Sequence, residues 1–161
     1  MSETLHPSAV TPSVFDLTPP TTAERTRLEA DLTAAERDVL LHHGTEAPFC
    51  GGLLDNKEDG VYCCRLCGLP LFQAKTKFES GTGWPSFWAP YAESHVVAVR
   101  DSSCGMVRVE TRCARCDSHQ GHVFPDGPPP SRLRYCINSV SLSFAMNGEP
   151  LPDPLGRGDR I

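Results

Sequence analysis

Long apolar runs and N-terminal basic residues are both missing from this sequence. No run approaches the roughly 18 apolar residues of a membrane span, so no contact with a membrane is expected. No Lys or Arg precedes Arg25, and the N-terminus has no apolar segment of the signal-peptide kind. Neither a secretory signal nor an Arg-rich transit peptide is therefore expected, and the cytoplasm is the expected location.

Basic residues are also too few to favour a basic surface. The chain carries 15 Lys and Arg residues against 20 Asp and Glu residues, which gives a net charge of −5. Binding to nucleic acid favours a basic face, so no nucleic-acid partner is expected. The length of 161 residues suits one domain, and we expect a monomer.

Composition divides the chain into three parts. Residues 1–20 are rich in Ser, Thr and Pro and have few large apolar residues, which predicts a disordered tail. Residues 21–147 are expected to form the single folded domain. Residues 148–161 are rich in Pro and Gly, which predicts a loose C-terminal tail.

The domain is expected to begin with two short helices and to continue as β structure. Thr21 with Glu24 and Thr33 with Glu36 have the spacing of capping boxes, which predicts helices that end near residues 30 and 43. Beyond them, segments are short and turn residues are frequent. The segments with β-type patterns are Val61–Cys63, Val96–Val99, Met106–Arg112 and Arg134–Phe144.

The last of these segments changes its apolar face near Asn138, since Val140 and Leu142 share the parity of Cys136. This predicts either a bulge or a strand that begins at a site and ends in the core.

Four of the eight cysteines form two Cys-x-x-Cys units, Cys64 with Cys67 and Cys113 with Cys116. Two such units can supply four thiolates to a closed, structural zinc site. The alternative, a thioredoxin-like redox motif, needs a βαβ context, and neither pair has one. Four thiolates leave no open position on the metal, so the zinc is expected to be structural rather than catalytic.

Cys136 lies between Arg134 and Asn138, and in a strand all three side chains share one face. A nearby positive charge lowers the pKa of a thiol and makes it a better nucleophile. The alternative is a half-buried structural cysteine. Cys50, Cys63 and Cys104 remain, and a second thiol near Cys136 would allow a nucleophile and a resolving cysteine.

His119 and His122 directly follow the second cysteine pair, in what the sequence predicts to be a loop. Histidine can supply the proton that acid-assisted chemistry needs at neutral pH; a structural or metal-binding role is the alternative. Trp84 lies among glycines in a loop, which suits a ring that faces a methyl or sulfur-bearing group. A core position is the alternative for Trp84.

Taken together, these motifs closely resemble the type B methionine-R-sulfoxide reductases, over about residues 32–144. The matching strings are GTE from Gly44, LDNKEDGVY from Leu54, GTGWPSFW from Gly81, GHVFPDGPPP from Gly121, RYCINS from Arg134 and both Cys-x-x-Cys units. The resemblance implies a mainly β fold of two antiparallel sheets in a rolled, tent-like core. It also implies short N-terminal helices and one structural Zn²⁺, away from the catalytic centre.

The implied activity is reduction of the R epimer of methionine sulfoxide in oxidised proteins, a repair reaction of oxidative stress. A cysteine sulfenic acid and an intramolecular disulfide would form in turn, and a thioredoxin-type reductant would restore the thiols. The residue roles that the resemblance implies are Cys136 as nucleophile, Arg134 in setting its pKa, Trp84 and Phe124 around the substrate methyl group, and His119, His122 and Asn138 around the sulfoxide oxygen.

One position departs from the family pattern. Many members carry the resolving cysteine in a Ser-Gly-Cys-Gly-Trp loop, where this sequence has Thr82. Other members carry it before the Leu-Asp-Asn-Lys motif, which Cys50 matches. We therefore expect Cys50 to be the resolving cysteine, with Cys104 second and Cys63 third, and a loop movement to bring it to Cys136. The alternative from another class, a zinc-knuckle binding module, leaves Cys136 and the histidines without a role.

Overall fold

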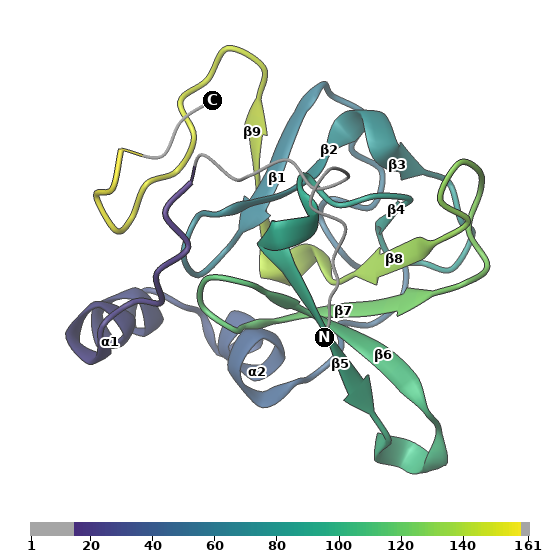
Figure 1. Ribbon diagram of the computed structural model, residues 1–161, viewed down its shortest axis with the longest axis horizontal. Coiled ribbons are helices and arrows are strands. Elements are labelled where there is room, and N and C mark those ends of the chain that lie inside the picture. The colour runs from purple at the N-terminus through teal and green to yellow at the C-terminus, as the bar shows by residue number, and fades with distance from the viewer. Residues whose placement is uncertain (1–14, 159–161) are drawn as a thin grey trace.

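The computed structural model describes residues 15–158, which form two short helices and two antiparallel sheets (Figure 1). This confirms the predicted fold class. The strands of the small sheet, in spatial order, are β2 (Pro70–Gln73), β1 (Gly60–Cys64) and β9 (Leu142–Met146). The strands of the large sheet, in spatial order, are β3 (Lys77–Phe78), β4 (Ser86–Phe87), β8 (Arg134–Ile137), β7 (His119–Phe124), β6 (Arg108–Cys113) and β5 (Val96–Asp101).

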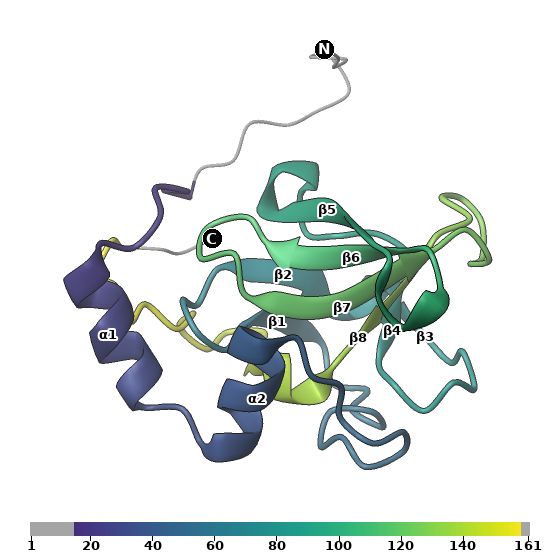
Figure 2. The same cartoon turned by 90° about the horizontal axis from the view of Figure 1, so that it is seen from below.

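Both predicted helices are present, α1 at Thr22–Ala30 and α2 at Ala34–His42, and each begins with the predicted capping box. Helix α2 ends one residue earlier than the glycine at position 44 suggested, because His43 itself takes the left-handed conformation with φ of 60°. The helices lie together at one side of the sheets, with α2 against β7 (Figure 2).

The two sheets are joined through aromatic side chains. Phe87 of the large sheet stacks on Phe72 of the small sheet at 4.5 Å between ring centroids and meets Tyr62 edge-on at 5.1 Å. Phe72 also contacts Tyr135 at 5.6 Å. Tyr62, Phe72 and Phe87 have no exposed surface. Rings of this size each bury a large apolar area, and their contacts across the two sheets fix how the sheets face one another.

The segment 134–144 is two strands rather than one. Strand β8 belongs to the large sheet and β9 to the small sheet, and a 3₁₀ turn at Ser139–Ser141 joins them. The apolar face changes side near Asn138 because the chain leaves one sheet there and enters the other. A single long strand was therefore the wrong prediction, although the predicted irregularity lies at the correct place.

Both ends of the described chain contact the domain. Phe15 is buried, with its ring edge-on to His95 at 5.4 Å, and Arg157 Nη1 donates a hydrogen bond to the carbonyl oxygen of Asp16 at 3.2 Å. Leu151 also packs on the core. Composition alone had predicted loose tails here; of the predicted N-terminal tail, residues 1–14 lie outside the described part. Neither helix within residues 15–158 is long and apolar enough to cross a membrane.

Candidate active site and cysteine cluster

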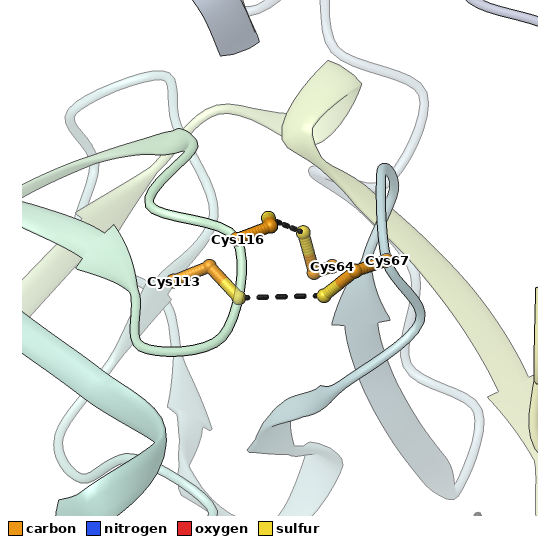
Figure 3. Close-up of side chains that lie close together, drawn as sticks. All are labelled: Cys64, Cys67, Cys113 and Cys116. Atoms are coloured by element: carbon orange, nitrogen blue, oxygen red, sulfur yellow. Dashed lines mark hydrogen bonds between the residues drawn. The ribbon is translucent and has the colours of Figure 1, made fainter. Parts of the chain in front are cut away.

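The four cysteines of the two Cys-x-x-Cys units meet at one point (Figure 3). Cys64 Sγ lies 3.6 Å from Cys116 Sγ, and Cys67 Sγ lies 3.6 Å from Cys113 Sγ. Sulfurs at the corners of a tetrahedron around zinc, with bonds of about 2.3 Å, are about 3.8 Å apart. All four side chains are buried. The geometry and the donor set therefore suit a metal ion enclosed by four thiolates.

Hydrogen-bond donors are directed at these sulfurs. Arg115 is 1% exposed, and its Nε donates to Cys67 Sγ at 3.5 Å. Gln120 Nε2 donates to Cys64 Sγ, also at 3.5 Å. Donors and a buried positive charge stabilise thiolates that hold a metal. Gly68, with φ of 85°, follows the first cysteine pair, and Asp117, with φ of 65°, follows the second, which lets each turn fold back on its sulfurs.

A separate cavity of about 100 Å³ contains Cys136 and none of the four clustered cysteines. Its lining residues are Thr45, Trp84, Arg108, Gly121, His122, Phe124, Cys136 and Asn138. Four predicted site residues besides Cys136 therefore line the cavity. His119 and Arg134 do not line the cavity. The Arg134 guanidinium instead lies over the Phe124 ring and lowers the pKa of the Cys136 thiol.

Strand register explains why these side chains share one face. Cys136 on β8 is paired with His122 on β7, and His122 is paired with Glu110 on β6. Directly paired residues in antiparallel strands point to the same side of a sheet. The nucleophile candidate, one histidine and one carboxylate therefore form a row across three strands.

Cys136 is half-buried, and its Sγ lies 4.0 Å from Thr82 Oγ1. Burial raises the pKa of the Cys136 thiol, and this effect outweighs the opposite effects of the Thr82 hydroxyl and the Arg134 charge. Arg134 therefore lowers the thiol pKa as the sequence suggested, but the net direction for the site without substrate is upward.

The Arg134 guanidinium is fixed from two sides. Its Nε and Nη2 donate to the two carboxylate oxygens of Asp126 at 2.9 and 3.1 Å, and it lies 4.3 Å over the centre of the Phe124 ring. The contact fixes the ring and the charge together. Sequence reasoning missed Asp126, although it stands within the quoted GHVFPDGPPP string.

His122 is oriented by a carboxylate from the edge strand. Its Nε2 lies 2.8 Å from Asp101 Oδ2, so Nδ1 is the nitrogen left for the cavity. Hydrogen bonds from Ser103 and His122 hold the pKa of the Asp101 carboxyl well below its ordinary value, so it is charged at neutral pH. Asp101 was missed because it lies 21 residues before His122 in the sequence.

His119 and His122 lie on strand β7, where the sequence had predicted a loop. A bulge places His119 opposite Arg112 and leaves Gln120 as the extra residue, so the two histidines share one face although they are three apart. His119 is 2% exposed, and its Nδ1 lies 2.6 Å from Glu110 Oε2. Burial lowers the pKa of His119, which favours the neutral imidazole. Sequence reasoning missed Glu110, because it belongs to none of the recognised motifs.

Glu46 forms backbone hydrogen bonds with two residues that line the cavity, Trp84 and Asn138. Its carbonyl oxygen accepts a hydrogen bond from Trp84 Nε1 at 3.0 Å, and its N–H donates to Asn138 Oδ1, also at 3.0 Å. Its side-chain Oε1 accepts the N–H of Val140 at 3.0 Å. Trp84 and Asn138 are thus positioned by one residue, which the sequence presents only as part of the quoted GTE string.

The candidate resolving cysteines differ in access. Cys50 is exposed, whereas Cys63 is buried within β1; the side chain of Cys104 lies outside the described part. The N–H of Phe49 donates to the carbonyl oxygen of Gly83 at 2.8 Å. The loop that carries Cys50 is therefore attached to the Trp84 loop, one residue from Thr82.

The fold and these sites define a class of protein: a small mainly-β domain with a buried four-cysteine cluster and a separate cavity built around one further cysteine. A match to the SelR domain covers residues 32–146, and the chain belongs to this family.

Three relatives share the name "Peptide methionine sulfoxide reductase MsrB". The chain is 80% identical to such a protein from Caulobacter vibrioides over 147 residues, which are 91% of this chain and 92% of the relative. It is 61% identical to one from Xylella fastidiosa over 145 residues, 90% of this chain and 94% of the relative. It is 52% identical to one from Escherichia coli over 126 residues, 77% of this chain and 92% of the relative.

Proposed function

We propose that this protein reduces the R epimer of methionine sulfoxide in oxidised proteins, with Cys136 as the nucleophile. The observation that carries the proposal is the cavity around Cys136, in which aromatic rings and polar groups line the same small space. Trp84 and Phe124 would contact the substrate methyl group. His122 and Asn138 would contact the sulfoxide oxygen. The cavity would distinguish the R epimer from the S epimer, because the methyl group would have to face the aromatic rings while the oxygen faces the polar groups.

The first step is attack of the Cys136 sulfur on the sulfoxide sulfur, with protonation of the oxygen as it becomes a hydroxyl. His122 is suited to donate this proton, because it lines the cavity and Asp101 holds its Nε2, which leaves Nδ1 facing the cavity. The thiol proton must leave Cys136. Thr82 and Arg134 both favour the thiolate, and they oppose the effect of burial.

The second step releases methionine and leaves Cys136 as a sulfenic acid, so that the oxygen atom passes from substrate to enzyme. A thiol then condenses with the sulfenic acid to form a disulfide and water. We assign this thiol to Cys50, since it is exposed and its loop is attached to the Trp84 loop. A thioredoxin-type dithiol would reduce the disulfide and regenerate both cysteines.

His119 supports this chemistry from behind the cavity. Its ring meets that of His122 at 5.5 Å between centroids, and Glu110 holds its Nδ1. In this role His119 positions His122 rather than touching the oxygen itself, which departs from the role that the resemblance implied.

We further propose that the cysteine cluster binds one Zn²⁺ through Cys64, Cys67, Cys113 and Cys116. The metal would supply structural stability by joining the ends of β1 and β6. Four thiolates close the coordination sphere, so no step of the reaction passes through it. We also propose that the enzyme is cytoplasmic and monomeric, and that it has no nucleic-acid or membrane partner.

Cys136→Ser tests the function. Reduction of a peptide with R-methionine sulfoxide should disappear, whereas the wild-type protein should leave the S epimer unchanged; chromatography of the peptide measures both. Cys63→Ser is the matched control, because Cys63 lies outside the cavity. Appreciable turnover by Cys136→Ser would refute the nucleophile assignment. An inactive wild-type protein would instead favour the binding-module alternative.

A further inference from the structure

Three metal-binding side chains converge outside the cysteine cluster. Glu110 Oε2 lies 2.8 Å from His43 Nδ1 and 2.6 Å from His119 Nδ1. The three atoms all lie within 4.8 Å of one another. The residues come from three elements that are far apart in the sequence: the end of α2, strand β6 and strand β7. The cluster is therefore built by the tertiary fold and not by a local motif.

Burial and pairing hold this arrangement in place. Glu110 is 5% exposed and His119 is 2% exposed. Arg112 Nη2 lies 3.0 Å from Glu110 Oε1, so the other carboxylate oxygen is left to the two histidines. The bulge at Gln120 turns His119 to this face. His43, whose left-handed conformation ends α2, supplies the third side chain of the cluster.

We propose that His43, Glu110 and His119 form a second metal site, for a divalent transition metal such as Zn²⁺, Ni²⁺ or Co²⁺. Two imidazoles and one carboxylate are a ligand set that these metals accept, with the remaining positions filled by water. The site differs from the cysteine cluster in donor atoms and in access, because the His43 side chain is 51% exposed and opens it to solvent.

Metal binding requires only small movements. Ligand atoms about 2.0–2.1 Å from a tetrahedral metal are about 3.3–3.4 Å apart, so the nitrogen–oxygen separations of 2.8 and 2.6 Å must widen by roughly 0.5–0.8 Å. His43 can provide much of this movement because it is exposed. A metal bound at Nδ1 requires that nitrogen to carry no proton, so the proton of each bound imidazole lies on Nε2. The Arg112 charge beside the site makes it weaker than the cysteine cluster.

Equilibrium dialysis of the zinc-loaded protein against Co²⁺ tests this proposal, with bound metals counted by mass spectrometry and the Co²⁺ visible spectrum recorded. The wild-type protein should bind one Co²⁺ per chain beyond its Zn²⁺, without a thiolate charge-transfer band. His43→Asn should lose this Co²⁺ at concentrations that saturate the wild type. Asn tolerates the left-handed conformation of the helix cap, so this variant removes the ligand without straining the backbone.

His42→Asn is the matched control, since His42 is the exposed neighbour on α2 and lies outside the cluster; it should bind Co²⁺ as the wild type does. Glu110→Gln, which retains the size of the buried side chain, should also lose the second metal. Absence of extra Co²⁺ in the wild type would overturn the proposal. So would a thiolate band, or unchanged binding in His43→Asn.

Discussion

Thr82 Oγ1 lies 4.0 Å from Cys136 Sγ, so residue 82 is directly beside the proposed nucleophile. In the family that the sequence resembles, this position commonly carries the resolving cysteine. The chain therefore keeps the geometry for a short-range disulfide but has a hydroxyl in place of the second sulfur. The proposed mechanism therefore assigns the resolving step to another thiol, which must be brought to the cavity.

A cysteine at position 82 should take over that step. Cys50→Ser should form about one methionine per enzyme molecule and lose cycling with thioredoxin, since no disulfide would form. Adding Thr82→Cys to that variant should restore cycling, because side-chain rotation can bring two sulfurs at this separation to the disulfide distance of about 2.05 Å. Methionine formed per enzyme, with and without thioredoxin, measures the effect.

Thr82→Ser in the Cys50→Ser background is the control and should remain limited to one turnover. Continued cycling in Cys50→Ser alone would contradict the assignment of Cys50. Loss of cycling on Cys104→Ser would then identify Cys104 as the resolving residue.

The pH dependence of Cys136 alkylation should show its raised pKa. Burial disfavours the thiolate, so the alkylation rate should reach half its maximum at a higher pH than in an unstructured cysteine peptide. Arg134→Gln should move the midpoint further up, because the Arg134 charge lowers the thiol pKa. Peptide mass spectrometry after iodoacetamide treatment resolves Cys136 from the other thiols. A midpoint below that of the free peptide would contradict the prediction.

Asp101→Asn should slow catalysis without removing the nucleophile. The carboxylate holds His122 Nε2 and so leaves Nδ1 for the cavity, and general acid catalysis commonly contributes about 100-fold or more. We expect kcat to fall by up to about 100-fold, because His122 Nδ1 would no longer be directed at the sulfoxide oxygen. Asp117→Asn is the control, because that exposed carboxylate contacts Arg112 instead. An unchanged kcat in Asp101→Asn would show that this carboxylate does not orient His122 for catalysis.

Cys64→Ser should release the cluster metal and destabilise the whole domain. The cluster joins turns that follow strands of different sheets, so its loss should weaken both sheets together. Metal content and thermal unfolding measure the outcome. Cys63→Ser, at the neighbouring buried position, should retain the metal. A metal-free Cys64→Ser protein with wild-type thermal stability would refute the structural role.

The sequence revealed those parts of the site that are local in the chain. Capping boxes and Cys-x-x-Cys units are set by spacings of three residues, so both helices and the composition of the cluster were predictable. Cys136 and His122 were found because each stands in a motif of its own.

The supporting carboxylates were missed for a physical reason. Asp101, Glu110 and Glu46 act through contacts between strands and loops that lie far apart in the sequence. Strand register decides these contacts, and one bulge at Gln120 reverses the face of His119. Periodicity likewise cannot show that a chain changes sheets, which is why β8 and β9 read as one strand.

The crossing between β8 and β9 also determines how this protein can change over evolution. Only the turn Ser139–Ser141 and one residue before it separate the strand of Cys136 from the strand that lies in the other sheet. The N–H groups of Ile137 and Asn138 are fixed to Pro85 and Gln120. Asn138 lines the cavity and Ser141 Oγ donates a hydrogen bond to the carbonyl oxygen of His119, so neither the length of this segment nor these two side chains can change without disturbing the site.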